Sequence, residues 1–126
     1  MAKILLIDDS TFILSSTRTF LEGEGHEVVG AAKNGQLGIE LYKEKNPDLV
    51  LLDLTMPTMN GGDCLDAILT FDGKANVLVV SALRDKATLQ GHLDRGAKDV
   101  VHKPLRFRDE SFNEEFRTKI SAALAA

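Results

Sequence analysis

Five polar side chains stand at corresponding places in this chain, each just after a short apolar run. Asp8 and Asp9 follow the first run, Asp53 follows the third, Ser81 the fourth and Lys103 the fifth. Three carboxylates that meet in one crevice repel one another, so such a cluster either raises a pKa or holds a cation. These residue types therefore suggest a cation site beside one amine and one hydroxyl.

The ligand types also favour a particular cation and a particular reaction. Hard oxygen ligands, with no histidine or thiol among them, favour Mg²⁺, which binds one or two protein carboxylates together with phosphate oxygens. One aspartate then remains free to attack phosphorus, while Mg²⁺ and the ammonium of Lys103 offset the charge of an anionic substrate. Ser81 could donate a hydrogen bond to a phosphoryl oxygen. The set predicts a phosphate-accepting site.

The elements that must position these side chains follow from short apolar runs that alternate with stretches of helical period. This alternation is typical of a doubly wound α/β fold, with a parallel sheet covered on both faces. The expected strands are residues 3–7, 27–31, 49–52, 77–80 and 99–102. The expected helices are residues 10–22, 34–45, 60–71, 85–95 and 111–125. Ligands bind at the carboxyl edge of such a sheet, where the five polar residues would meet.

Several helix boundaries are predicted from capping residues and a proline. Asn34 is expected to cap the second helix, and Asn46-Pro47 to end it, because proline disfavours a helical conformation in the residue before it. Ser111 and Glu114 have capping-box spacing at the start of the last helix. Gly91 lies inside the fourth helix, at a cost of about 1 kcal/mol relative to alanine, so this helix is the expected place for local motion.

Composition and charge exclude several classes of protein. The 126 residues suit one domain, expected over residues 1–126, and the formal charge of −4 gives no basic field for nucleic acid or anionic lipid. The longest apolar stretches, residues 4–7 and 49–52, are far shorter than the ~18 residues that span a bilayer, and no signal peptide is recognised. Cys64 is the only cysteine, which fits a reducing compartment such as the cytoplasm.

Each polar residue taken alone has a simpler explanation. Asp8-Asp9 could cap a helix, Asp53 could end a strand in a turn, and Ser81 could cap the fourth helix. Lys103 could be an exposed turn residue. The three histidines do not cluster and are assigned no chemistry, and Cys64 is expected to be a small, buried or half-buried residue. The functional interpretation is favoured because all of these residues are expected at one edge.

Four motifs, in order at four predicted strand ends, resemble the receiver domains of two-component response regulators. They are Asp8-Asp9, Asp53-Leu54-Thr55-Met56-Pro57 with Asn60-Gly61, Ser81-Ala82, and Lys103-Pro104. The similarity covers nearly the whole chain, which also looks complete and stand-alone, although a fragment of a larger regulator remains an alternative. The resemblance implies a flavodoxin-like (βα)5 fold with five parallel strands in the order 2-1-3-4-5.

The same resemblance assigns roles to individual residues. Asp53 would be the phosphorylated residue, and Mg²⁺ would be held by Asp8, Asp9, Asp53 and the backbone carbonyl of Thr55. Ser81 and Lys103 would bind the phosphoryl oxygens, and the Lys103–Pro104 bond would be cis.

Two features depart from the family's pattern. The family often has an aromatic switch residue three positions before the lysine, where this chain has Val100. The stretch from Leu105 to Glu110 also delays the last helix, so the connection before it is longer than usual.

The resemblance implies a signalling switch that catalyses only its own phosphorylation and dephosphorylation. A sensor histidine kinase or a phosphotransfer protein would supply the phosphoryl group. The response would appear at a face made of residues 85–95, 99–102 and 111–125, which would control a downstream protein effector. A monomer is expected, with dimerisation on activation as an alternative.

Three other functions stay open at this stage. A degenerate receiver that works only as a docking module would fold normally without Mg²⁺-dependent phosphorylation. An aspartate-nucleophile phosphatase normally has a second acid two positions after its nucleophile at the first strand, where Asp8 is followed by Ser10. A flavin module would need a hydroxyl- and glycine-rich loop after the first strand, and Asp8-Asp9 has the wrong charge for it.

Overall fold

The fold alternates strands and helices along the whole chain. The structure is a computed structural model that describes residues 1–56 and 59–125. The strands are β1 (Lys3–Ile7), β2 (Glu27–Ala32), β3 (Leu49–Asp53), β4 (Val77–Ser81) and β5 (Asp99–His102). The helices are α1 (Thr11–Gly23), α2 (Gly35–Lys45), α3 (Gly61–Phe71), α4 (Lys86–Arg95) and α5 (Glu110–Ala125). Every predicted element is present. Pro57 of the third-strand motif and Ala126 lie outside the described residues.

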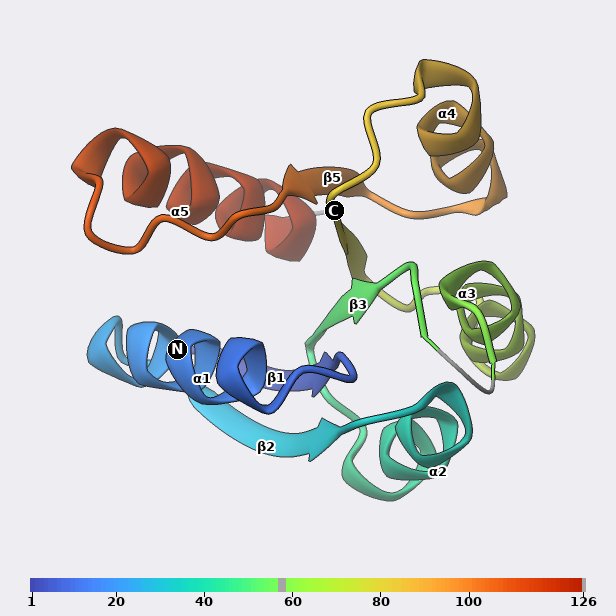
Figure 1. The fold of residues 1–126 in the computed structure, drawn as a ribbon. Helices are drawn as coiled ribbons and strands as arrows, with labels where there is room; N and C mark the ends of the chain where they lie inside the picture. Colours follow the sequence, from blue (N-terminus) through green and yellow to red (C-terminus); the bar gives the residue numbers. More distant parts are fainter. Residues whose placement is uncertain (57–58, 126) are drawn as a thin grey trace.

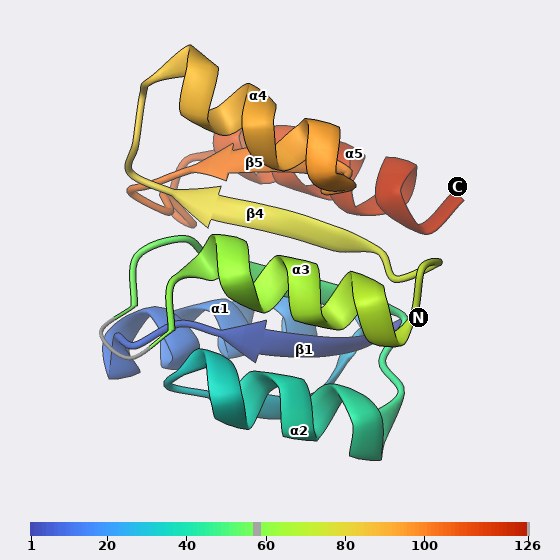
Figure 2. The same ribbon diagram turned by 90° about the vertical axis from the view of Figure 1, so that its right-hand side faces the viewer.

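The five strands form one parallel sheet in the order β2-β1-β3-β4-β5, which confirms the predicted order. Helices α1 and α5 cover one face of the sheet, and α2, α3 and α4 cover the other (Figures 1 and 2). The strand order reverses at β1, because the chain first adds β2 on one side and then β3 on the other. The carboxyl ends of β1 and β3 are therefore neighbours at the point where doubly wound sheets bind ligands.

Two hydrophobic clusters, one on each face, hold the layers together. Leu5, Ile7, Val50 and Leu52 belong to the cluster under α2, α3 and α4. The alternate strand positions, such as Ile4 and Leu51, belong to the cluster under α1 and α5. Burial on both faces explains why the strands show no alternation of apolar and polar residues.

The helix boundaries confirm most of the predicted capping chemistry. The side chain of Asn34 accepts a hydrogen bond from the backbone N–H of Leu37 at 2.8 Å and caps α2. Asn46, at the end of that helix, is left-handed with φ 47°. The chain then continues through Pro47, so the predicted stop is also confirmed.

The predicted capping box at Ser111 and Glu114 is wrong. Helix α5 begins one residue earlier, at Glu110, and Asp109 takes the capping position. One oxygen of Asp109 accepts hydrogen bonds from both the backbone N–H and the hydroxyl of Ser111, each at 2.9 Å. A carboxylate is the better cap here, since its charge also interacts favourably with the helix dipole.

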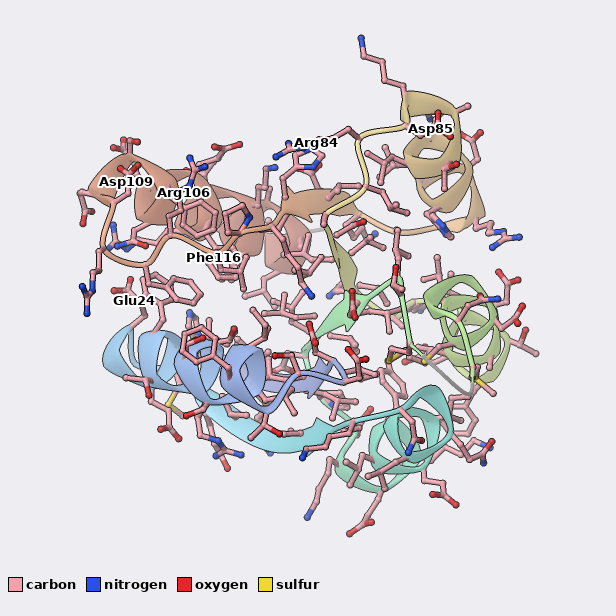
Figure 3. All side chains as sticks on the ribbon, viewed as in Figure 1. Glu24, Arg84, Asp85, Arg106, Asp109 and Phe116 are labelled. Atoms are coloured by element: carbon pink, nitrogen blue, oxygen red, sulfur yellow. The ribbon has the colours of Figure 1, made fainter. Side chains whose placement is uncertain are left out.

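Helix α5 packs against α1 through aromatic side chains. Phe116 lies between the two helices, with its ring centroid 5.7 Å from that of Phe20 (Figure 3). Among the described residues, no helix is long and apolar enough to cross a membrane.

Candidate functional site

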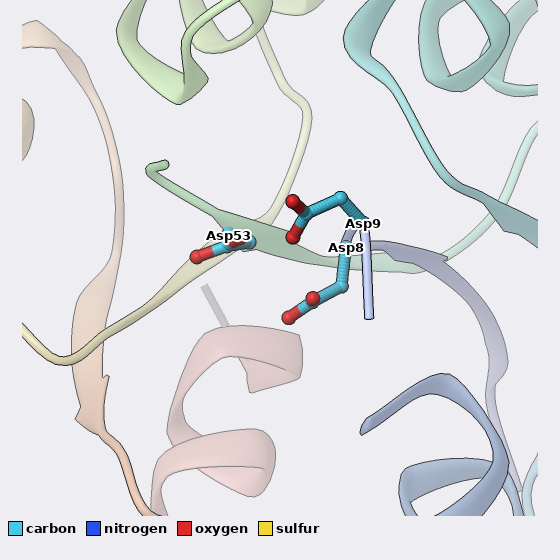
Figure 4. A group of neighbouring side chains, drawn as sticks. All are labelled: Asp8, Asp9 and Asp53. Atoms are coloured by element: carbon cyan, nitrogen blue, oxygen red, sulfur yellow. The ribbon is translucent and has the colours of Figure 1, made fainter. Parts of the chain in front are cut away.

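Three carboxylates converge at the carboxyl ends of β1 and β3. Ile7 pairs with Leu52 in the sheet, so Asp8 and Asp53 come one step later on adjacent strands. One oxygen from each of Asp8, Asp9 and Asp53 lies within 4.8 Å of the others (Figure 4). Asp8 and Asp53 are only 4% and 5% exposed, whereas Asp9 is exposed. The sequence-based prediction that these acids meet is confirmed.

Backbone groups fix the orientation of the two buried carboxylates. Oδ1 of Asp8 accepts a hydrogen bond from the backbone N–H of Ser10 at 2.9 Å. Oδ1 of Asp53 accepts a longer one, of 3.4 Å, from the backbone N–H of Thr55. Ser10, and not Asp8 or Asp9, caps α1, since its hydroxyl accepts from the backbone N–H of Ile13. The acids are thus left free of a capping role.

Lys103 brings one positive charge to the acids from the end of β5. Its ammonium lies 2.9 Å from Oδ2 of Asp8 and 3.4 Å from Oδ1 of Asp53. Burial alone would lower the pKa of Lys103, but its contacts with Asp8 and Asp53 outweigh this effect and raise the pKa. Lys103 is therefore charged at neutral pH. The Lys103–Pro104 peptide bond is cis, as the resemblance implies.

The Asp53 carboxylate has a raised pKa and is held through one of its two oxygens. Burial raises the pKa of Asp53 and the charge of Asp8 raises it further, while Lys103 opposes the shift. The hydrogen bond from Thr55 and the ion pair with Lys103 both use Oδ1. Within the described part of the chain, Oδ2 has no hydrogen-bond or ion-pair partner, so this oxygen is available for reaction.

Ser81 lies at the same edge of the sheet as the three acids. It is buried at the end of β4, and its backbone carbonyl accepts from the backbone N–H of Lys103 at 2.9 Å. Its hydroxyl oxygen accepts from the backbone N–H of Leu83 at 2.9 Å and makes no hydrogen bond with Asp53. Asp85, not Ser81, caps α4. Among residues 1–56 and 59–125 the Ser81 hydroxyl donates no hydrogen bond, so its proton is available to a further acceptor.

Gly61 positions Asp53, a role that the sequence analysis did not assign. The backbone N–H of Gly61 donates to the carbonyl of Leu54 at 2.8 Å. A Cβ atom at this position would lie 2.5 Å from the carbonyl oxygen of Asp53 and would also clash with the backbone of Leu54. Only glycine lets the start of α3 approach the end of β3 this closely. The adjacent Asn60 cap was the signal that could have revealed it.

Val100 is buried in the core cluster with Leu89 and Ala97. Its aliphatic side chain has neither a ring nor a hydroxyl that could follow a movement of Ser81. The position of the family's aromatic switch is therefore occupied by a packed aliphatic side chain.

The donor set fits a hard divalent cation. Three carboxylate oxygens carry more negative charge than the one ammonium of Lys103 can offset. With oxygen ligands alone, such a set prefers Mg²⁺ to softer metals. The acids could hold the ion while leaving room for phosphate oxygens.

The family of the chain follows from comparison with known proteins. The family model described as the response regulator receiver domain matches residues 4–110. The chain therefore belongs to the response regulator receiver domain family.

Comparison with individual proteins shows which members of this family the chain resembles. The chain is 38% identical over 104 residues to the chemotaxis protein CheY of Thermotoga maritima, covering 82% of this chain and 87% of that protein. It is 39% identical over 104 residues to protein CcdB of Bacillus subtilis, with the same coverage. A CheX–CheY complex with BeF3 and Mg from Borrelia burgdorferi contains a similar fold: the TM-score is 0.85 at 32% identity, covering 94% of this chain and 85% of that one.

The protein is thus a CheY-like receiver domain, a phospho-accepting signalling switch of a two-component system. Receiver domains of this kind bind Mg²⁺ at an acidic pocket and interact with histidine kinases and downstream effectors. They are generally not enzymes, so family membership disfavours the phosphatase and flavin alternatives.

Proposed function

We propose that Asp53 receives a phosphoryl group from a phosphohistidine of a sensor histidine kinase or phosphotransfer protein, in a Mg²⁺-dependent reaction. The transfer breaks the N–P bond of the donor and forms an O–P bond to Asp53, while the histidine nitrogen takes up a proton. The convergence of three acids and Lys103 carries this proposal. The unpartnered Oδ2 of Asp53 is the attacking oxygen.

The neighbouring groups bind the metal ion and the phosphoryl oxygens. Asp8, Asp9, Asp53 and the backbone carbonyl of Thr55 hold Mg²⁺, which when bound offsets the negative charge of the phosphoryl oxygens. Lys103 binds one phosphoryl oxygen. To reach it, the flexible side chain of Lys103 turns away from Asp8. Ser81 donates a hydrogen bond from its free proton to another phosphoryl oxygen. The chain catalyses only its own phosphorylation and dephosphorylation.

The signal leaves the site through the strands that carry Ser81 and Lys103. A phosphoryl group adds up to about two negative charges, which attract the hydroxyl of Ser81 and the ammonium of Lys103. These residues end β4 and β5, so their movement changes the α4–β5–α5 face that controls a downstream protein effector. Gly91 in α4 lowers the cost of this change. Because Val100 is aliphatic, the change does not rely on an aromatic switch.

The proposal also covers the domain organisation, the cellular compartment and the oligomeric state of the protein. Residues 1–126 form a single receiver domain, since α5, beyond the matched range, packs Phe116 and Ile120 into the core cluster with Ile4. The buried free Cys64 suits the reducing cytoplasm, and burial raises the pKa of its thiol to about 11, so it stays protonated. The protein acts as a monomer, with dimerisation on activation as the alternative.

The test is phosphorylation with acetyl phosphate and Mg²⁺, followed by mass spectrometry. The wild-type protein should gain one phosphoryl group, and Asp53→Asn should gain none. Asp66→Asn, which changes an exposed aspartate on α3, is the matched control and should be labelled like the wild type. Equal labelling of wild type and Asp53→Asn would refute the site. A folded wild-type protein that takes up no phosphate with any donor would instead indicate the docking module.

A further inference from the structure

A pocket with a volume of about 280 Å³ lies between the end of β5 and the first half of α5. Residues 101–104 form one wall, and α5 forms the other with side chains that include Phe112. Arg84 enters the pocket from the connection after β4, and Arg106 enters it from the connection after β5. None of the three carboxylates of the phosphate-accepting site lines it. The pocket is therefore distinct from that site.

The other charged side chains of this pocket already have partners. Glu115 makes an ion pair with Lys119 at 3.4 Å. Asp109 caps α5 and accepts two hydrogen bonds from Ser111. The ammonium of Lys103 also belongs to the lining, but it is held by the carboxylate site. What remains to be balanced is the charge of the two arginines.

Arg84 and Arg106 are both exposed, and neither makes an ion pair within residues 1–56 and 59–125. Nη2 of Arg84 donates to the carbonyl oxygen of Lys103 at 3.4 Å, which holds the guanidinium near the end of β5. The hydrogen bonds with Ser111 lower the pKa of Asp109 most, and the charge of Arg106 adds a smaller effect. Figure 3 shows both arginines on the side of the molecule that carries β5 and α5. Two guanidinium groups in one pocket repel each other, so a bound anion would stabilise them.

Phe112 adds a flat apolar surface to the same pocket. Its ring is partly exposed and packs against the rings of Phe107 and Phe116, with centroid distances of 5.8 Å and 5.9 Å. These contacts fix its orientation. A fixed aromatic ring binds a flat heterocycle by stacking, and the guanidinium of arginine binds phosphate oxygens in pairs. The pocket thus combines the two surfaces that recognise a phosphorylated heterocycle.

We propose that this pocket binds a mononucleotide, with its phosphate on Arg84 and Arg106 and its base against Phe112. A phosphate monoester carries up to about two negative charges at neutral pH, which matches two guanidinium groups. The volume is near the lower limit of ligand sites, about 300–1,000 Å³, so the ligand is small. The formal charge of −4 disfavours a nucleic acid strand. The pocket borders the α4–β5–α5 face, but a small ligand there is distinct from the protein effector, so the inference goes beyond the proposed function.

The test is titration of the unphosphorylated full chain with AMP, GMP, CMP and UMP in a chelator, followed by calorimetry and by ¹H–¹⁵N NMR. At least one nucleotide should bind saturably and shift the signals of Arg84, Arg106 and Phe112. Ribose 5-phosphate, which lacks the base, should bind about tenfold more weakly. Arg84→Ala/Arg106→Ala should weaken nucleotide binding about tenfold or more, and added salt should weaken it too. Phe112→Leu should weaken nucleotide binding about fivefold and leave ribose 5-phosphate unaffected.

The control is Lys98→Ala/Arg108→Ala, which removes the same two charges at exposed positions outside the pocket. It should keep the wild-type affinity. The proposal is overturned if none of the four nucleotides binds saturably, if the arginine variant binds as the wild type does, or if inorganic phosphate binds as tightly as the best nucleotide.

A further variant separates this pocket from the phosphate-accepting site. Asp53→Asn should bind the nucleotide like the wild type, because Asp53 does not line the pocket and the chelator removes Mg²⁺. Loss of nucleotide binding in Asp53→Asn would place the ligand at the carboxylates and overturn the proposal. Acetyl phosphate should still label Arg84→Ala/Arg106→Ala, which keeps Asp53 and Lys103.

Discussion

The ammonium of Lys103 lies closer to Asp8 than to Asp53, with distances of 2.9 Å to Oδ2 of Asp8 and 3.4 Å to Oδ1 of Asp53. Its positive charge is therefore closer to Asp8, which we assign to Mg²⁺ binding, than to Asp53, which we expect to be phosphorylated. Lys103 therefore both repels an incoming cation and supplies the charge that a phosphoryl group needs. These two effects can be separated by mutation.

Lys103→Met should bind Mg²⁺ more tightly and accept phosphate less well. Removing one positive charge a few ångströms from the acids should raise the affinity for Mg²⁺ about tenfold. The same change should lower the rate of labelling by acetyl phosphate, because no ammonium remains to bind a phosphoryl oxygen. Isothermal titration calorimetry measures the first effect and mass spectrometry the second. Lys98→Met, at an exposed position before β5, should change neither, and weaker Mg²⁺ binding by Lys103→Met would contradict the geometry.

Asp53→Asn should stabilise the protein in the absence of divalent ions. Burial and the charge of Asp8 raise the pKa of Asp53, so the folded protein binds this proton more tightly than the unfolded chain. Ionisation at neutral pH therefore costs stability, and that cost disappears as the pH falls through the raised pKa to the ordinary value of about 3.9. We expect Asp53→Asn to gain about 1 kcal/mol in the free energy of unfolding at pH 7. Urea denaturation in a chelator measures it.

Two comparisons make this result specific. The gain should shrink as the pH is lowered toward 4. It should also shrink in excess Mg²⁺, which stabilises the wild type more than a variant that lacks one of the proposed carboxylate ligands. Asp66→Asn should show neither dependence. A loss of stability in Asp53→Asn at pH 7 without metal would mean that the Lys103–Asp53 ion pair outweighs the repulsion from Asp8.

The strand ends could be predicted from the sequence because the carboxyl edge of a parallel sheet is set by topology alone. The five apolar runs place Asp8, Asp53 and Lys103 at one edge of the sheet, and the strand order implied by the resemblance makes them neighbours there. The role of Gly61 could not be predicted, since it depends on how closely α3 approaches the backbone of Asp53. The hydrogen bond from the backbone N–H of Leu83 to the Ser81 hydroxyl could not be predicted either, because it depends on the geometry of the turn after β4 and not on residue type.

Gly61→Ala should damage the site without touching any charged residue. The added Cβ would clash with the Asp53 carbonyl and Leu54, so the start of α3 must shift. We expect a loss of about 1–3 kcal/mol in the free energy of unfolding and a lower rate of phosphorylation. Gly73→Ala, where the nearest atom to a new Cβ is 3.9 Å away, is the control for a glycine change. A wild-type phosphorylation rate in Gly61→Ala would show that Asp53 does not need this packing.

The start of α5 gives a prediction that reverses the expectation from the sequence. Asp109 accepts both hydrogen bonds that fix the first turn, and these bonds with Ser111 lower the pKa of Asp109. Asp109→Ala should therefore lower the melting temperature at pH 7 more than Ser111→Ala, which removes only the hydroxyl bond. A carboxylate whose pKa is lower in the folded than in the unfolded protein contributes its full stabilisation at a pH above the unfolded-state pKa. This stabilisation is lost as the pH falls through the folded-state pKa. The difference in melting temperature between wild type and Asp109→Ala should therefore disappear in acid. Calorimetric melting at pH 7 and below pH 3 tests this. A larger drop in melting temperature in Ser111→Ala than in Asp109→Ala would instead support the Ser111–Glu114 capping box.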